Sequence, residues 1–322
     1  MLQYRSIPSV KKIIFLMLVV VLLAGAGGCT FLKVNIGEEV QPLQEKAIAG
    51  HGKDKVLVLD ISGIIMSGEQ GTPLTERKKP ALIARVREAL DRARQDKRVK
   101  AVVLRINSPG GGVTASDMLY HELKKFKQET GAAIVAHIMD VGTSGAYYAA
   151  LAADAITAQP TSITGSIGVI LYRVDATGLM QKVGLQTVEI VSADKKGMGS
   201  PFRALTDGER KIFQGFIDSL YDRFTGLVAQ ERKLKPEDVK RLADGRIYTS
   251  TEAQAGGLID RIGYLDDAVE LAKARARLAE ATVVTYFRPG DYRANIYSMN
   301  LINVDLGDLA DPGASFLYLW WP

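Results

Sequence analysis

A serine lies on a short glycine-containing turn near the middle of the chain. Ser144 is part of "MDVGTSGAYYAALAAD" (residues 139–154), with Gly142 and Gly145 around it and an apolar, alanine-rich run after it. A nucleophilic serine needs a base to take its proton and backbone N–H groups to stabilise the oxyanion. A helix that starts directly after the serine directs its N–H groups at that charge. Ser144 is therefore a candidate nucleophile, with a plain helix N-cap as the alternative.

A second glycine-rich loop follows another apolar run. The segment "NSPGGG" covers residues 107–112, after the predicted strand at 99–107. The serine turn follows a predicted strand at 132–139. The carboxyl ends of parallel strands meet at one edge of a sheet, so the two loops should lie close together. Their N–H groups could then bind the same oxyanion.

The base that would serve this serine is not evident from the residues alone. His137 lies in an apolar strand, His121 on a charged helix face, and His51 in a polar segment, and none has a clear orienting partner. A lysine acts as a base only where its environment favours the neutral amine. "DKKGMGSPF" offers Lys195 and Lys196, although this segment alone favours a solvated turn for the pair.

The surrounding pattern predicts an α/β domain. Strands at 55–66, 99–107 and 132–139 alternate with amphipathic helices at 81–97 and about 115–129, which is typical of a mainly parallel sheet. "TDGE" caps a long helix from Thr206. Its apolar stripe consists of Phe213, Phe216, Ile217, Leu220, Phe224, Leu227 and Val228. We expect a linker at 33–54, a domain at 55–280 and a tail at 281–322 that ends in "FLYLWWP".

The N-terminus predicts export. Basic residues precede an uninterrupted apolar run at 13–28, a pattern that holds the N-terminus in the cytoplasm. Residues 13–32 are long enough for a membrane anchor. Alternatively, the run ends at Cys29, the only cysteine, in a segment that resembles a lipoprotein signal with Ala26 in the place of the usual leucine. The net charge of +5 is too small and too dispersed for nucleic-acid binding.

Five ordered segments resemble the signal peptide peptidase A family, in its shorter single-domain form, across about residues 56–271. They are "LRINSPGGGV", "GTSGAYYAALAAD", "ITGSIGVI", "KKGMGSPFRALTDGER" and "DGRIYTSTEAQAGGLIDRIG". The resemblance implies a Clp protease/crotonase-like fold, a serine–lysine dyad, a homo-oligomer, and neither a cofactor nor a metal.

The resemblance also assigns roles to residues of this chain. It places the nucleophile at Ser144 and the base at Lys196, with the adjacent Lys195 as the second choice and Gly197 as a departure from the family pattern. It gives Ser166 the task of orienting the lysine. The oxyanion donors that it implies are the N–H groups of Gly110 or Gly111, together with that of Gly145.

These features predict a membrane-tethered serine endopeptidase of the bacterial cell envelope. Its catalytic domain would lie on the non-cytoplasmic side of the inner membrane and degrade cleaved signal peptides. The alternatives are a crotonase-like acyl-thioester enzyme and a catalytically inactive envelope scaffold. Neither "NSPGGGVTA" nor "GTSGAYYAALAA" contains Asp or Glu, so we expect an extended apolar peptide, held as an added strand, with a small or aliphatic residue before the cut.

Overall fold

The computed structural model describes residues 41–68, 80–289, 295–298 and 315–320. The chain divides into two compact units, Met1–Pro42 and Leu43–Pro322, and every described helix and strand belongs to the second. Within the described ranges, no helix is both long enough and apolar enough to cross a membrane. The predicted anchor or signal segment, with Cys29, lies outside these ranges.

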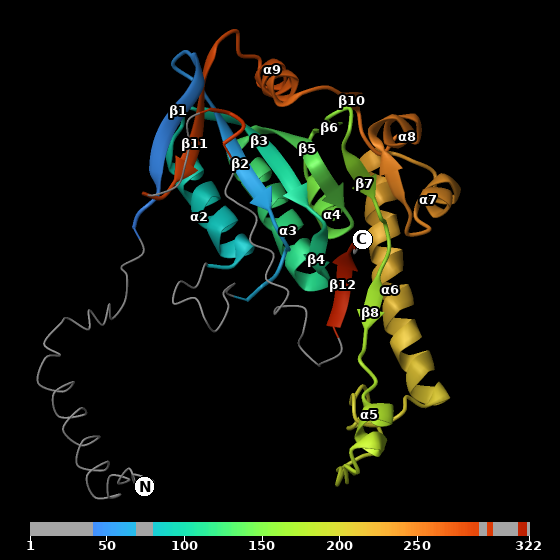
Figure 1. Ribbon diagram of the computed structural model, residues 1–322. Helices are drawn as coiled ribbons and strands as arrows, with labels where there is room; N and C mark the ends of the chain where they lie inside the picture. Colours follow the sequence, from blue (N-terminus) through green and yellow to red (C-terminus); the bar gives the residue numbers. More distant parts are fainter. Residues whose placement is uncertain (1–40, 69–79, 290–294, 299–314, 321–322) are drawn as a thin grey trace, which may run out of the picture. The chain divides into compact units, whose positions relative to one another are not determined.

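A mixed, mostly parallel sheet of nine strands forms the frame of the described part (Figure 1). β1 is antiparallel to β11, β7 is antiparallel to β9, and all the other pairs are parallel. The main path runs β1 (Gln44–His51), β11 (Ala281–Phe287), β2 (Lys55–Ser62), β3 (Val99–Ser108), β5 (Ala133–Thr143), β6 (Ala155–Ala158) and β10 (Arg261–Ile262). β7 (Ile163–Gly165) pairs with the end of β5 and with β9 (Ile247–Thr249). The predicted parallel α/β core is thus confirmed.

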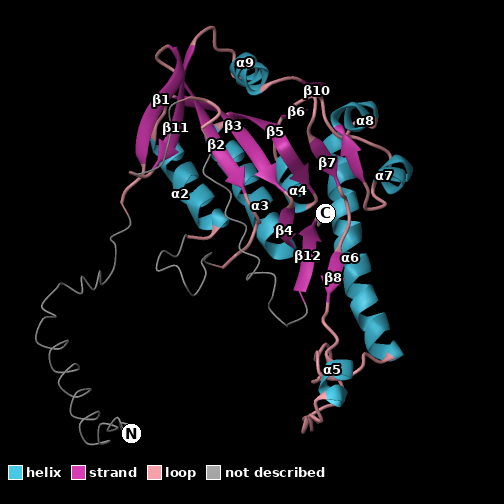
Figure 2. Cartoon of the chain, in the orientation of Figure 1, coloured by secondary structure: helices cyan, strands magenta, loops and turns pink. Residues whose placement is uncertain are grey.

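Helices cover both faces of this sheet (Figure 2). α2 (Leu82–Gln95), α3 (Val113–Thr130) and α4 (Gly145–Ala150) pack on one face, and α9 (Leu265–Arg275) packs on the other. The alternation of β2 accounts for this, since Leu57 and Leu59 join the first core and Val56 and Val58 the second. Two further short helices are α7 (Pro236–Leu242) and α8 (Ser250–Ala255).

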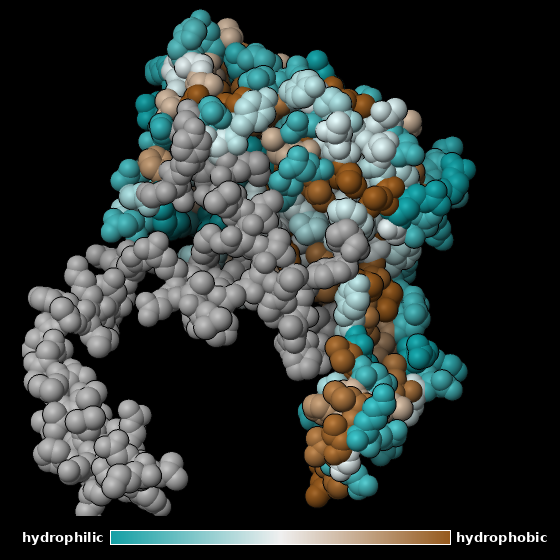
Figure 3. All heavy atoms as spheres, viewed as in Figure 1, coloured by the Kyte–Doolittle hydropathy of each residue, from teal (hydrophilic) through white to brown (hydrophobic). Residues whose placement is uncertain are grey.

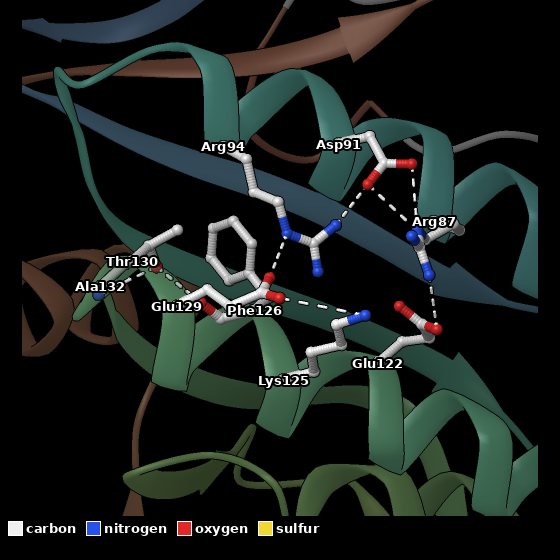
Figure 4. A network of polar contacts seen from close by, with 9 residues as sticks. All are labelled: Arg87, Asp91, Arg94, Glu122, Lys125, Phe126, Glu129, Thr130 and Ala132. Atoms are coloured by element: carbon white, nitrogen blue, oxygen red, sulfur yellow. Dashed lines mark hydrogen bonds and ion pairs between the residues drawn. The ribbon is translucent and has the colours of Figure 1, made fainter.

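Ion pairs tie α2 to α3 at the protein surface. Arg87 contacts Glu122 at 2.7 Å and Arg94 contacts Glu129 at 2.7 Å, as Figure 4 shows. Partly exposed pairs of this kind contribute little individually. The alignment of α3 on the sheet therefore rests on its buried side chains, among them Leu119, Leu123 and Phe126.

The domain extends beyond its predicted limits of 55–280. β1 lies within the segment expected to be a linker, and β11 lies within the segment expected to be a tail, yet both belong to the main sheet. A second tail strand, β12 (Ser315–Leu319), forms a small sheet with β4 (Gly110–Gly112) and β8 (Ile170–Tyr172) and is antiparallel to both.

The long helix α6 (Asp207–Arg232) begins at the predicted capping box. The Thr206 hydroxyl accepts from the Glu209 N–H, and the Glu209 carboxylate accepts from the Thr206 N–H. The hydrogen bonds and the charge of Arg203 lower the pKa of Glu209 to about 2. Ahead of α6, the chain between residues 173 and 205 carries the short helix α5 (Thr177–Lys182).

Candidate active site

Ser144 lies on a strained turn between β5 and α4. Its φ is 52°, in the left-handed region that non-glycine residues rarely adopt, at a typical cost of about 1–3 kcal/mol. Its N–H donates to the Gly165 carbonyl at 2.8 Å, and its carbonyl accepts from the Tyr148 N–H at 2.9 Å. The residue is only 1% exposed. These bonds hold the serine at the N-terminus of α4, as the sequence predicted.

Ser166 is brought close to Ser144 by the pairing of β7 with β5. Thr143 on β5 pairs with Gly165 on β7. Ser144 and Ser166 are the next residues after this pair, one at the end of each strand. Ser166 also has a positive φ, 49°, and its N–H donates to the Arg246 carbonyl at 2.7 Å. Two strained serines therefore lie at adjacent positions of one sheet edge.

The glycines of the two loops converge on one point. A Cβ built on Gly110 would lie 2.7 Å from the Gly145 amide nitrogen, and one built on Gly145 would lie 3.2 Å from the Gly111 nitrogen. A Cβ on Gly145 would also lie 3.0 Å from the carbonyl oxygen of Tyr318, and a Cβ on Gly110 would overlap that oxygen. This carbonyl group excludes a side chain at Gly110, whereas at Gly145 the closest obstacle to a Cβ is the Ser116 hydroxyl oxygen.

The two candidate donors on the first loop differ in their bonding. The N–H of Gly110 donates to the Ser108 hydroxyl at 3.1 Å. Gly111 is the register partner of Tyr318 in the small sheet. Gly111 and Gly145 are therefore better placed than Gly110 to donate to a carbonyl at this point.

The chain's own C-terminal strand lies in the groove between β4 and β8. Leu317 pairs with Gly112 on one side and with Ile170 on the other. The Trp320 N–H continues the contact by donating to the Pro109 carbonyl at 2.9 Å. The sequence showed "FLYLWWP" to be apolar, but nothing in its pattern indicated this partner. The site thus already holds an extended peptide.

The lysines do not reach the serines within one copy of the chain. Lys195 and Lys196 are both exposed, and in the described part of the chain no hydrogen bond joins either to Ser144 or Ser166. They follow α5, which Figure 1 shows at the far end of α6 from α4. The serines and glycines of the predicted site meet, whereas the predicted base lies elsewhere.

The histidines are not placed to replace the lysine. His137 is fully buried in β5, with Nδ1 2.8 Å from the Thr157 hydroxyl, and burial lowers its pKa to about 4. His121 and His51 are exposed, as their patterns predicted. Among the described residues, no cluster of His, Cys, Asp or Glu could hold a metal ion.

Comparison with known proteins gives the class of this site. Residues 126–279 match the model of peptidase family S49. An Enterococcus faecium protein named as a candidate signal peptide peptidase SppA is 35% identical over 244 residues, which cover 76% of this chain and 70% of that protein. The chloroplastic serine protease SPPA of Arabidopsis thaliana is 32% identical over 264 residues, 79% of this chain and 38% of that protein. A solved ClpP1 mutant from Listeria monocytogenes covers 66% of this chain and 94% of its own, with 17% identity and a TM-score of 0.43.

The sequence matches make the chain a serine peptidase. It belongs to peptidase family S49, in the signal peptide peptidase A family. This confirms the predicted family and disfavours the acyl-thioester alternative.

Proposed function

We propose that the chain is a membrane-tethered endopeptidase in which Ser144 attacks extended apolar peptides. The observation that carries this proposal is the carbonyl of Tyr318, which lies beside the residue that follows Ser144 and is surrounded by Gly110, Gly111 and Gly145. A peptide strand that binds between β4 and β8 in the same way would present its own carbonyl to the serine.

The arrangement supports acyl transfer. The Ser144 hydroxyl oxygen attacks the peptide carbonyl carbon, and the N–H groups of Gly111 and Gly145 stabilise the oxyanion. The serine proton passes to a neutral lysine and then to the leaving amine. Water next hydrolyses the acyl-serine, with the same lysine as base. α4 begins at Gly145, so its N-terminal end adds to the stabilisation of the negative charge.

We assign the base to Lys196 of a second copy of the chain. The segment that carries it exposes an apolar surface, visible in brown at the lower end of Figure 3, and patches of this kind mark protein interfaces. Its exposed side chains include Val174, Leu179, Val183, Leu185, Val188 at 85% and Ile190 at 96%. A second copy that covers this surface would remove water from Lys196, which favours the neutral amine that a base needs. Ser166, beside Ser144, would orient that amine.

Tethering follows from the N-terminal sequence. The apolar run at 13–28 would hold the domain on the non-cytoplasmic side of the bacterial inner membrane, through an uncleaved anchor or a lipid on Cys29. Remnants of signal peptides are apolar and remain at that membrane, so they fit both the groove and the location. The resulting enzyme would be a homo-oligomer of the cell envelope.

Mixing two inactive variants tests both Ser144 as the nucleophile and a lysine base shared between copies. Ser144→Ala and Lys196→Ala should each abolish peptide cleavage, because the two groups act as one proton-transfer unit. Co-expressed with different tags and purified together, they should recover activity, since some sites combine an intact serine with an intact lysine. Lys195→Ala is the matched control and should remain active.

The assignment of the nucleophile and the assignment of the shared lysine can fail separately. A mixture as inactive as its components would contradict a lysine shared between copies. Turnover by Ser144→Ala alone would contradict the nucleophile. A wild-type chain that neither cleaves peptides nor reacts with a fluorophosphonate would instead support the inactive scaffold.

A further inference from the structure

Strand β5 contains a bulge directly ahead of the turn that carries Ser144. Ile106 of β3 pairs with Ile138 of β5, and the next pair along these strands is Ser108 with Gly142. One residue of β3 therefore lies opposite three residues of β5, 139–141. The backbone bends tightly here, since a Cβ on Gly142 would lie 2.7 Å from a side-chain carbon of Ile138. Bulges redirect a strand and are frequent beside active sites.

Both loops of the candidate site leave the sheet from the pair of Ser108 and Gly142. On β3 the chain continues from Ser108 to Gly111, and on β5 it continues from Gly142 to Ser144. A movement of the bulge would therefore shift the proposed nucleophile relative to the proposed oxyanion donor. A displacement of about 1 Å can lower a rate by a factor of about 10², so the site needs a contact that fixes the bulge.

Asn107 is the residue of β3 that lies opposite the bulge, and its side chain bonds to two of the three bulge residues. Its amide oxygen accepts from the Val141 N–H at 3.2 Å, and its amide nitrogen donates to the Asp140 carboxylate at 2.9 Å. The Val141 N–H fixes the orientation of the amide, because only the oxygen can accept.

The backbone of Asn107 is itself held from the opposite side. Its carbonyl accepts from the Gly63 N–H at 3.1 Å, just after the end of β2, and the residue is buried. The side chain therefore extends from a fixed strand to the bulge, and it determines where the bulge lies relative to β3.

We propose that Asn107 is a positioning residue that sets the distance between the Ser144 hydroxyl and the Gly111 N–H. The inference rests on the proposed function, in which these two groups act on the same peptide carbonyl. Asn107 acts through the bulge, so its loss should slow the chemical step. An amide that only satisfied polar groups in the sheet would change the stability of the fold and leave the chemical step unchanged.

Asn107→Leu tests this role in the full chain, because leucine has a similar volume and makes neither bond. A bound peptide pairs with β4, which belongs to the same loop as Gly111, so the variant should still bind it but present its carbonyl at the wrong distance from Ser144. We expect kcat for a fluorogenic apolar peptide to fall by about 30- to 100-fold and KM to change by less than about threefold. Competition by β12 affects KM and not kcat, so kcat reports on the positioning.

Thr285→Val is the matched control. The buried Thr285 hydroxyl donates to the Val58 carbonyl at 3.2 Å, in the same sheet but between β11 and β2. This variant also loses a buried side-chain hydrogen bond, and it should keep kcat within about twofold of the wild-type value because that bond contacts neither loop. Urea unfolding of each variant shows that the protein measured is folded.

An exchange of the two side chains gives a second test. Asn107→Asp places two carboxylates side by side with no hydrogen atom between them, which should push the bulge away from β3 and lower kcat by at least about tenfold. Asp140→Asn alone should resemble wild type, because its amide oxygen still accepts from Asn107. The double variant, Asn107→Asp with Asp140→Asn, again pairs a donor with an acceptor, so its kcat should return to within about threefold of wild type.

Three results would overturn the inference. The first is a folded Asn107→Leu variant with the kcat of wild type, and the second is a loss of activity that appears in KM alone. The third is a double variant that is no faster than Asn107→Asp, and this comparison decides the matter if Asn107→Leu does not fold.

The role of Asn107 and the proposed function fail in different ways. If wild type cleaves the peptide, Ser144→Ala does not, and the Asn107 variants keep the kcat of wild type, the proposed function stands and the role of Asn107 is wrong. If wild type cleaves no peptide and no fluorophosphonate labels Ser144, the proposed function is wrong and the role of Asn107 falls with it.

Discussion

Replacing Tyr318 by alanine should open the groove and raise the activity toward added peptides. The side chain is fully buried between the Tyr148 and Phe224 rings and donates to the Leu220 carbonyl. Loss of a buried aromatic side chain usually costs about 3–5 kcal/mol. Each 1.4 kcal/mol is a factor of about ten, so the equilibrium constant for occupancy of the groove by β12 should fall by roughly 10²- to 4 × 10³-fold. The rate can rise only until the groove is open in every molecule, so the gain is smaller if many wild-type molecules already have an open groove.

Two readouts measure this gain. One is kcat/KM for a fluorogenic peptide well below saturation, and the other is the rate of fluorophosphonate labelling, which needs no peptide. Tyr318→Phe keeps the ring and loses one hydrogen bond of about 1 kcal/mol, so it should give roughly a fivefold gain at most. The expected order is wild type, then Tyr318→Phe, then Tyr318→Ala. Equal rates in all three, with the tail shown to be intact by mass spectrometry, would refute the idea that β12 occupies the groove in solution.

Three further predictions concern the site and its support. Gly145→Ala should lower kcat/KM by roughly a hundredfold, because its Cβ would overlap the Ser116 hydroxyl and crowd the carbonyl position; near-normal kinetics would contradict the placement of the oxyanion. Burial lowers the pKa of His137 from 6.5 to about 4, so the unfolded chain binds more protons in that range. The free energy of unfolding should therefore be highest above pH 6.5 and fall by roughly 3 kcal/mol towards pH 4, and His137→Leu should remove this part of the slope in urea titrations. Peptidase activity should rise from acidic to alkaline pH as the lysine base becomes neutral, and a flat profile would argue against a lysine.

The parallel core could be predicted because its strands are buried on both faces. β2, β3 and β5 appear in the sequence as short apolar runs followed by turns and amphipathic helices. The meeting of the glycine loop with Ser144 follows from the same rule, since both leave the carboxyl ends of parallel strands. Most of the candidate site could therefore be predicted from local sequence patterns.

The strands β1 and β12 could not be predicted from the sequence in the same way. β1 is largely exposed, so its sequence "QEKAIAGH" has no clear apolar alternation, and its partner β11 is distant in the sequence. β12 is apolar, but its pairing depends on a groove formed by β4 and β8, which only the folded chain creates. The separation of Lys196 from Ser144 is likewise a property of the path between α5 and α6, which sequence motifs do not record.

The most direct test of the account is to find the residue that a fluorophosphonate modifies. The full chain, in wild-type and Tyr318→Ala forms, is labelled, digested and mapped by mass spectrometry, with Ser144→Ala and Ser166→Ala as controls. The account predicts one label, on Ser144, in every form except Ser144→Ala, with faster labelling in Tyr318→Ala. A label on a different residue, or undiminished labelling of Ser144→Ala, would contradict the assignment of Ser144 as the nucleophile.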